Sequence, residues 1–191
     1  MLKELLTGII ILGCFSAAQS ASLKNTRFHD EASDTIKLNN ILIDAKANVG
    51  DQKPCNRVAY IGKQFLGVPY QPGTLDNSGE EEVTVNLDGF DCTTYVETVL
   101  ALAYTVGEGR TSWRDFVYNL ERLRYRSGEA KGYGSRLHYA SDWIVDNVHR
   151  GNFTEATGII PLSEAGVKTI DFMSSNRSKS VSYTHLTLPT N

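Results

Sequence analysis

The chain has 191 residues, of which 41% are hydrophobic and 21% are charged, and its formal net charge is -3. This length and composition fit one ordinary globular domain. The slightly acidic balance leaves no basic surplus for a phosphate backbone, so we expect no nucleic-acid partner.

Residues 1–21 have the pattern of a secretion signal. Lys3 is followed by an almost wholly apolar run, and Ala18 and Ser20 form a small-x-small cleavage site. The run is too short to span a bilayer and no later stretch approaches about 20 apolar residues, so no transmembrane segment is expected. Simple cleavage is favoured, and the alternative is processing before Cys14, which would leave a lipid anchor there. Either route predicts an exported protein, periplasmic or associated with the cell envelope.

The segment after the signal, residues 22–34, is polar and is expected to be irregular. Apolar residues at helical spacing then predict one helix over residues 35–47, ended before Gly50, and a second over residues 54–66. Pro at the start of the second helix and Gly just past its end fit the usual preferences of helix termini.

A rigid loop rich in Gly and Pro, residues 67–74, comes next. Alternating Val and Leu residues within 80–87 then predict a strand with Thr84 and Asn86 facing water. This strand leads into the stretch Gly89-Phe90-Asp91-Cys92.

A helix is expected to begin at Cys92, because apolar residues from Tyr95 to Val106 recur at three- and four-residue steps. The first four amides of a helix lack intrahelical partners and carry partial positive charge, so they stabilise a thiolate relative to a thiol. Cys92 is therefore a candidate nucleophile. The alternative is a small buried apolar residue, as most free cysteines are.

Two more helices are expected downstream. Thr111 and Ser112 cap a helix that runs to Leu123, and its charged face is interpreted as a solvated surface. A glycine-rich loop then leads to a helix over residues 137–148 that stops at Gly151. Further on, two short stretches are compatible with strands or loops, residues 157–161 and 167–173.

The mature chain keeps Cys55 and Cys92, and two cysteines in an exported protein can pair. Such a disulfide would consume the proposed nucleophile, so the catalytic interpretation requires reduced Cys92. Cys55 has no motif around it and is interpreted as a packing residue.

The last residues, 181–191, have no charge and no apolar period, and they resemble the translation of a sequencing adapter. On this interpretation the authentic sequence stops near Lys179 or Ser180, the gene is truncated, and His185 is not catalytic. A natural polar tail is the alternative.

The separated motifs, in this order, resemble a known family. A helix, the loop Gly67-Val68-Pro69-Tyr70 and the stretch Gly89–Thr94 resemble the papain-like NlpC superfamily of bacterial cell-wall hydrolases. Within it, residues 91–97 and 135–143 resemble the N-acetylmuramoyl-L-alanine amidase-like branch. The resemblance runs from about residue 54 to 176. It implies an α+β fold of the papain-like cysteine hydrolase type, truncated here to a domain over residues 35–180 that keeps the helical half and lacks most of the antiparallel sheet.

The resemblance also implies a chemistry. Cys92 would attack the amide between N-acetylmuramic acid and L-alanine in peptidoglycan fragments, the muropeptides that are the expected partners. Tyr70, Asp91 and His138 are the expected substrate-binding residues. For Asp91 capping of the helix is the simpler role, and for Tyr70 the alternative is packing under its loop. No cofactor is expected, and no metal site, because the cysteines and histidines lack ligand spacing.

The superfamily carries its catalytic histidine on a strand after the cysteine helix, and no such motif exists between Cys92 and Ser180. His138 and His149 are expected near one face of the same helix, with His138 lining the cleft on the substrate side. The missing base is attributed to truncation, so these 191 residues are expected to hydrolyse amides negligibly.

Three other functions remain open at this point. The same nucleophile would serve a D-glutamyl-to-diamino-acid endopeptidase of the same superfamily. A non-catalytic cell-wall-binding domain would keep the cysteine as a relic. A disulfide-stabilised exported domain would have no catalytic thiol at all.

Overall fold

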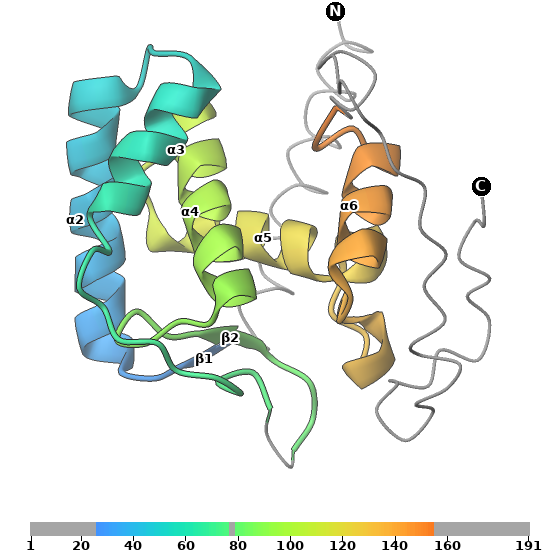
Figure 1. Ribbon diagram of the computed structural model, residues 1–191. Helices are drawn as coiled ribbons and strands as arrows, with labels where there is room; N and C mark the ends of the chain where they lie inside the picture. The colour runs from blue at the N-terminus through green and yellow to red at the C-terminus, as the bar shows by residue number, and fades with distance from the viewer. Residues whose placement is uncertain (1–25, 77–78, 155–191) are drawn as a thin grey trace, which may run out of the picture.

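The computed structural model describes residues 26–76 and 79–154, which form a helical domain with one small sheet (Figure 1). In chain order the elements are β1 (Thr26–Phe28), α2 (Glu31–Val49), α3 (Pro54–Lys63), β2 (Val83–Val85), α4 (Cys92–Gly107), α5 (Trp113–Arg124), the short 3-10 turns η1 (Arg126–Gly128) and η2 (Tyr133–Ser135), and α6 (Ala140–His149). This mixture of helices with a small two-stranded sheet is consistent with the α+β expectation. Several expectations lie outside the described residues: the signal, the lipid anchor at Cys14, the stretches 157–161 and 167–173, and the tail with His185.

Helix α4 is the centre of the domain, and α2, α3 and α5 all pack against it. Its apolar residues recur at helical spacing and are buried, as the sequence predicts. Figure 1 shows α5 running from behind α4 toward α6, so that α6 stands apart from α2 and α3. The core between these helices is made of large apolar side chains that are almost wholly buried: Leu38, Leu42, Ile61, Leu102, Phe116 and Leu120.

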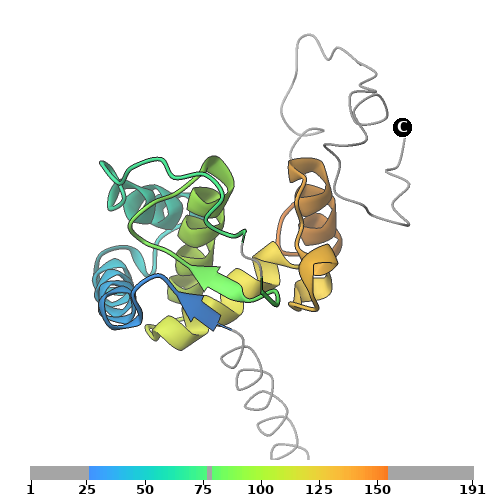
Figure 2. The ribbon, with the colours of Figure 1, turned by 90° about the horizontal axis from the view of Figure 1, so that it is seen from below.

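The sheet consists of β1 and β2, paired in parallel with Thr26 opposite Val83 and Phe28 opposite Val85 (Figure 2). The expectation that residues 22–34 are irregular is therefore wrong for the described part. Asp30 also begins α2 four residues earlier than expected, because its Oδ1 accepts a hydrogen bond from the Ser33 amide at 3.1 Å.

The prediction that Thr84 faces water is also wrong, since this residue is only 7% exposed. Arg27 donates to its hydroxyl at 3.1 Å, and Arg124 donates to its backbone carbonyl at 2.6 Å. Asn86, the other residue expected in water, is half-buried. The alternation of apolar and polar residues alone assigns this face of β2 to solvent, but long side chains from other elements cover it.

Helix α5 is capped by Ser112 as expected, with Ser112 Oγ 3.2 Å from the Arg114 amide that donates to it. Of its charged residues Arg114 is exposed and Asp115, Glu121 and Arg122 are partly buried. Arg124 is 1% exposed, so the interpretation of that residue as surface is wrong.

The expected helix over residues 137–148 is shorter at its beginning. Leu137 donates its amide to the Arg124 carbonyl at 3.0 Å, and Arg136 forms an antiparallel bridge with Tyr125. These contacts hold residues 136–139 extended against the end of α5, and α6 begins only at Ala140. His138 therefore does not share a helix with His149, contrary to the expectation.

In the parts of the chain that the structure describes, every helix is too short or too polar to cross a bilayer.

Candidate active site

The start of α4 is built by Asp91. Its Oδ1 accepts a hydrogen bond from the Thr94 amide at 2.8 Å, and the Thr94 hydroxyl in turn accepts from the Asp91 amide at 2.9 Å. This reciprocal capping box satisfies amides that a helix start leaves unpaired. It makes Cys92 the first residue of the helix, as the sequence predicts, and it supports the capping role of Asp91.

Cys92 is exposed, and its Sγ lies 4.0 Å from the Thr93 hydroxyl. Both Cys92 and Cys55 are free thiols, so the structure does not contain the disulfide considered as an alternative. Cys55 is exposed in the first turn of α3, and its interpretation as a packing residue is wrong.

The loop with Tyr70 runs beside the residues that precede Cys92. Phe90 donates its amide to the Pro69 carbonyl at 3.2 Å and accepts from the Gln71 amide at 2.9 Å, which makes a short parallel bridge between Tyr70 and Phe90. Tyr70 itself is 72% exposed, so the structure contradicts the alternative that it packs under its loop.

Gly89 allows this close approach of the two segments. A Cβ at this position would lie 2.8 Å from the Gln71 Cβ, a separation that real side chains essentially never show. The bridge between the two segments therefore requires glycine at this point, and it brings the Tyr70 loop to the start of the Cys92 helix.

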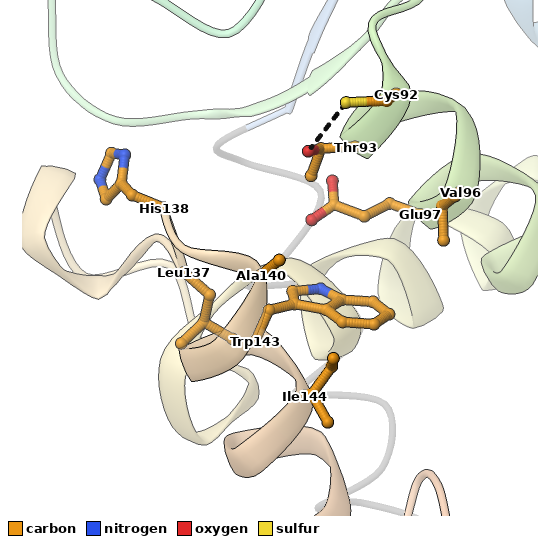
Figure 3. Close-up of a pocket in the computed structure, with 9 residues that line it drawn as sticks. All are labelled: Cys92, Thr93, Val96, Glu97, Leu137, His138, Ala140, Trp143 and Ile144. Atoms are coloured by element: carbon orange, nitrogen blue, oxygen red, sulfur yellow. Dashed lines mark hydrogen bonds between the residues drawn. The ribbon is translucent and has the colours of Figure 1, made fainter. Parts of the chain in front are cut away.

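A cavity of about 260 Å³ opens beside Cys92 (Figure 3). One side is formed by α4, and the other by the extended segment before α6 together with the first turns of α6. The side chains that line it are Cys92, Thr93, Val96, Glu97, Leu137, His138, Ala140, Trp143 and Ile144. The structure therefore brings two of the predicted site residues, Cys92 and His138, to the same cavity, and His138 lies across it from Cys92 in Figure 3.

The imidazole of His138 is held by the loop that precedes it. Its Nε2 lies 3.0 Å from the Tyr133 carbonyl, and the two rings have centroids 4.4 Å apart. A carbonyl can only accept, so Nε2 carries the proton and the acceptor position of the neutral ring is Nδ1.

The ring of His138 is stabilised in its neutral form. Burial lowers the pKa of His138 below its usual value of 6.5, and Arg136 acts in the same direction. The Tyr133 carbonyl and the carboxylates of Glu81 and Asp76 oppose this lowering. The ring is therefore uncharged at neutral pH.

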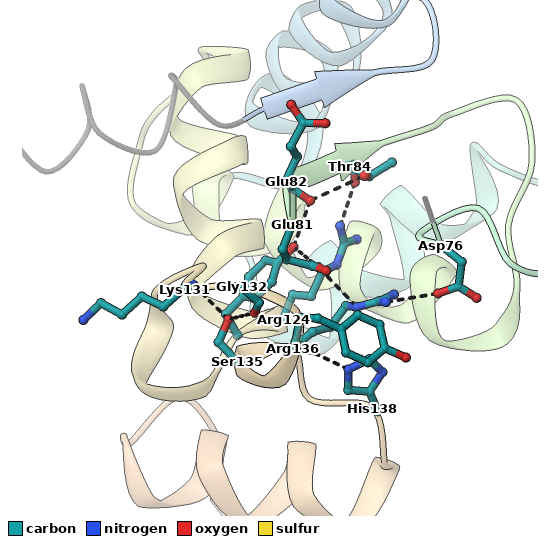
Figure 4. A network of polar contacts seen from close by, with 12 residues as sticks. Asp76, Glu81, Glu82, Thr84, Arg124, Lys131, Gly132, Ser135, Arg136 and His138 are labelled. Atoms are coloured by element: carbon teal, nitrogen blue, oxygen red, sulfur yellow. Dashed lines mark hydrogen bonds and ion pairs between the residues drawn. The ribbon is translucent and has the colours of Figure 1, made fainter. Parts of the chain in front are cut away.

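The segment that carries His138 is anchored by a polar network (Figure 4). The guanidinium of Arg136 forms ion pairs with Glu81 at 3.2 Å and with Asp76 at 3.0 Å. The Tyr125 hydroxyl lies 2.9 Å from Glu81 Oε1, and burial raises the pKa of that tyrosine. This network fixes residues 136–138 against the chain that leads to β2, and so it positions the histidine.

Sequence reasoning missed Glu97, which lies on the cavity wall. Its carboxylate pairs with the Arg124 guanidinium at 2.7 Å, and both side chains are 2% exposed. Burial raises the pKa of Glu97, and the charge of Arg124 opposes that effect. One feature of the sequence could have identified Glu97: it is a carboxylate on the apolar face of a predicted helix, five residues after the candidate nucleophile.

Within residues 26–76 and 79–154, no group of three or more His, Cys, Asp or Glu side chains is arranged to hold a metal ion.

Together these features define a class of protein. A cysteine at a helix start, open to a cavity that also contains a neutral histidine, is an arrangement that covalent hydrolases use. The model of the AmiA-like family, described as N-acetylmuramoyl-L-alanine amidase-like, matches residues 60–180. The chain belongs to this family.

Several solved structures are similar to this chain, including one that is named as an amidase. An N-acetylmuramoyl-L-alanine amidase from Bacteroides uniformis is 38% identical with a TM-score of 0.56, and the alignment covers 65% of this chain and 52% of that one. A Legionella pneumophila protein is 30% identical with a TM-score of 0.51, over 64% of this chain and 40% of that one. A Bacteroides fragilis protein with a provisional xylanase name is 38% identical with a TM-score of 0.51, over 61% of this chain and 50% of that one.

This chain therefore spans about half the length of the amidase structure that it matches. The search of curated proteins found no match.

Proposed function

We propose that the protein is a cysteine amidase that cleaves the bond between N-acetylmuramic acid and L-alanine in peptidoglycan fragments. The observation that carries the proposal is the placement of Cys92 at the capped start of α4, open to the cavity that His138 also lines. The family and the amidase from Bacteroides uniformis supply the substrate class. The resemblance of the sequence motifs to the papain-like NlpC superfamily is the reason for assigning Cys92 as the nucleophile.

The steps follow from the chemistry of the helix start. The Cys92 thiolate adds to the lactyl carbonyl carbon, and backbone amides of the first turn stabilise the oxyanion. The C–N bond then breaks as the nitrogen takes a proton from solvent, the amine of L-alanine leaves, and a thioester remains on the sulfur. Water then adds to the thioester and gives its two protons to solvent, which releases the muramoyl carboxylate and restores the thiolate.

Two other residues take substrate-side roles in this proposal. Tyr70, exposed beside the helix start, contacts the substrate next to the nucleophile. His138 lies across the cavity from Cys92 and contacts the substrate through its imidazole.

The proposal includes export. Peptidoglycan lies outside the cytoplasm, and residues 1–21 have the sequence pattern of a secretion signal. A periplasmic or envelope location is consistent with both observations.

Acyl transfer from an activated thioester tests the nucleophile by itself, because a thiolate leaving group needs no proton donor. The phenyl thioester of N-acetylmuramic acid is incubated with the full chain, and the intact mass is measured. We expect one muramoyl group on Cys92, lost in Cys92→Ala and kept in Cys55→Ala. Equal labelling of Cys14, Cys55 and Cys92, or no labelling, would overturn the proposal.

A second thioester separates the endopeptidase from the amidase. The γ-thioester of a D-glutamyl peptide presents the carbonyl that an endopeptidase would attack. We expect it to acylate Cys92 more slowly than the muramoyl thioester, and the reverse order would favour the endopeptidase. Reversible binding of both compounds without acylation would favour the non-catalytic cell-wall-binding domain.

The provisional xylanase name of the Bacteroides fragilis protein does not transfer to this site. Glycosidases generally use two carboxyl groups on opposite sides of the scissile bond. Among the described residues Glu97 is the one carboxylate that lines the cavity, and it is already paired with Arg124.

A further inference from the structure

The cavity wall holds a carboxylate that is only partly satisfied. Glu97 is 1% exposed, and its Oε2 is held by Arg124 at 2.7 Å. Oε1 has no hydrogen bond to any described residue, although the side chain lines the cavity. The ion pair with Arg124, itself tied to the Thr84 carbonyl, holds this carboxylate in place.

A donor without a partner lies on the opposite wall. The Nε1 of Trp143, on α6, is buried and makes no hydrogen bond within the described part of the chain. Its ring packs against Phe153 with centroids 5.0 Å apart, which fixes its orientation. In Figure 3 the indole nitrogen and the Glu97 carboxylate face the same space. A buried donor that stays unpaired is costly, so the pair of groups is suited to a ligand that both donates and accepts.

The rest of the lining is apolar. Val96, Leu137, Ala140 and Ile144 surround the two polar groups. The cavity of about 260 Å³ is below the roughly 300–1,000 Å³ of typical ligand pockets, so it fits one substituent of a larger substrate. Because Arg124 already neutralises Glu97, the cavity has no surplus negative charge to hold an ammonium group.

We propose that Glu97 and Trp143 bind a secondary amide that carries a methyl group. Glu97 Oε1 accepts from the amide N–H, Trp143 Nε1 donates to the amide carbonyl, and the apolar wall contacts the methyl. This inference rests on the proposed function, whose substrate contains two such amides: the acetamido group of the sugar, and the amide that joins the lactyl group to L-alanine.

Protection of Cys92 from alkylation tests the inference, because Cys92 lines the same cavity. Iodoacetamide reacts with the full chain carrying Cys14→Ser and Cys55→Ser, in which Cys92 is the remaining cysteine, while the ligand concentration is varied. We expect N-acetylmuramic acid or lactoyl-L-alanine to slow the reaction at concentrations at least tenfold below those needed for its partner that lacks the amide N–H. These partners are muramic acid, with a free amine, and the ester analogue of lactoyl-L-alanine.

The two ligand pairs distinguish the two sources of the amide. Discrimination within the sugar pair assigns the cavity to the acetamido group, and discrimination within the lactoyl pair assigns it to the alanine amide. Discrimination in neither pair overturns the inference. These comparisons change the ligand alone, so they do not depend on the stability of a variant.

Two variants locate the contacts. Trp143→Phe removes the N–H and keeps an aromatic ring, and it should raise the concentration of the preferred amide needed for protection roughly tenfold. Glu97→Gln should do the same if it folds. Val145→Ala, at an exposed position of α6 that does not line the cavity, should leave protection unchanged. If Trp143→Phe leaves protection by the preferred amide unchanged, the donor role of Trp143 is wrong.

The outcomes are independent of the thioester experiment. Acylation of Cys92 without amide discrimination would remove this inference and keep the amidase. Amide discrimination without acylation would remove the amidase and keep the binding site.

Discussion

Two helices of this domain begin with a free cysteine in the first turn, and only one of these starts is built as a site. At α3 the N-cap residue Lys53 makes no side-chain hydrogen bond to the helix, and Cys55 Sγ has only Asn56 Oδ1 nearby at 3.7 Å. At α4 a capping box fixes the first turn, and Cys92 lines a cavity with His138. A helix start offers unpaired amides in both places, so the surrounding elements and not the helix end alone distinguish the nucleophile candidate.

The largest expected difference between the two regions concerns the buried ion pair beneath the start of α4. Arg124→Met leaves Glu97 buried without its partner, and the free energy of unfolding should fall by about 3–5 kcal/mol. Lys63→Met, at the exposed end of α3, should change it by less than about 0.5 kcal/mol. Urea unfolding at neutral pH measures both, and similar values for the two variants would show that the pair does not support the site.

The N-cap residues of α4 and α3 should differ less in their contributions to the free energy of unfolding. Asp91→Ala removes the side chain that accepts from the Thr94 amide, and it should cost about 1 kcal/mol of unfolding free energy. Lys53→Ala should cost much less, because Lys53 makes no cap hydrogen bond. Thermal unfolding of the two variants checks this, and equal losses would contradict the role of the capping box.

The free energy of unfolding should also depend on pH through His138, which lines the cavity beside α4. Because burial lowers the pKa of His138 below 6.5, the unfolded chain takes up a proton more readily than the folded one. The free energy of unfolding is therefore highest above pH 6.5, where His138 is neutral in both states. It decreases as the pH falls below 6.5 toward the pKa of His138 in the folded chain. His138→Gln should reduce this slope in the unfolding free energy between pH 5 and 7, which urea unfolding at a series of pH values measures. A slope equal to that of the unsubstituted chain would argue against a neutral, half-buried His138.

The smallest expected effect belongs to Tyr70. Tyr70→Phe removes a hydroxyl from a side chain that is 72% exposed, so stability should change by less than about 0.5 kcal/mol. Loss of one hydrogen bond should weaken protection of Cys92 by N-acetylmuramic acid about threefold, and alkylation of Cys55 should not change. Unchanged protection at Cys92 would remove Tyr70 from the substrate site.

The start of the site was predictable from local sequence. Helical spacing after Cys92 and an aspartate just before it are enough to place a capped helix there, and the structure has α4 at those residues. The capped start of α5 followed from the same kind of signal. Both features depend on residues within a few positions of one another.

The other half of the site depends on contacts between distant segments. His138 lies in an extended segment because residues 136 and 137 pair with the end of α5, and this pairing overrides a helical apolar pattern. Arg124 has the sequence context of a surface arginine and is buried only because Glu97 and Thr84 meet it. A single sequence has no local signal for either contact.

The parallel pairing of β1 with β2 has a consequence for the order of folding. Arg27 and Thr84, which join across these strands, are 57 positions apart in the chain. Before the first hydrogen bond between these parallel strands can form, the chain must pay the entropy of closing the large loop that joins them. We therefore expect this pairing to form later than helices α2 and α3, whose contacts are local. During synthesis, β1 has no partner strand until residues 83–85 have left the ribosome. Limited proteolysis of chains stalled before that point should therefore cut near residue 28.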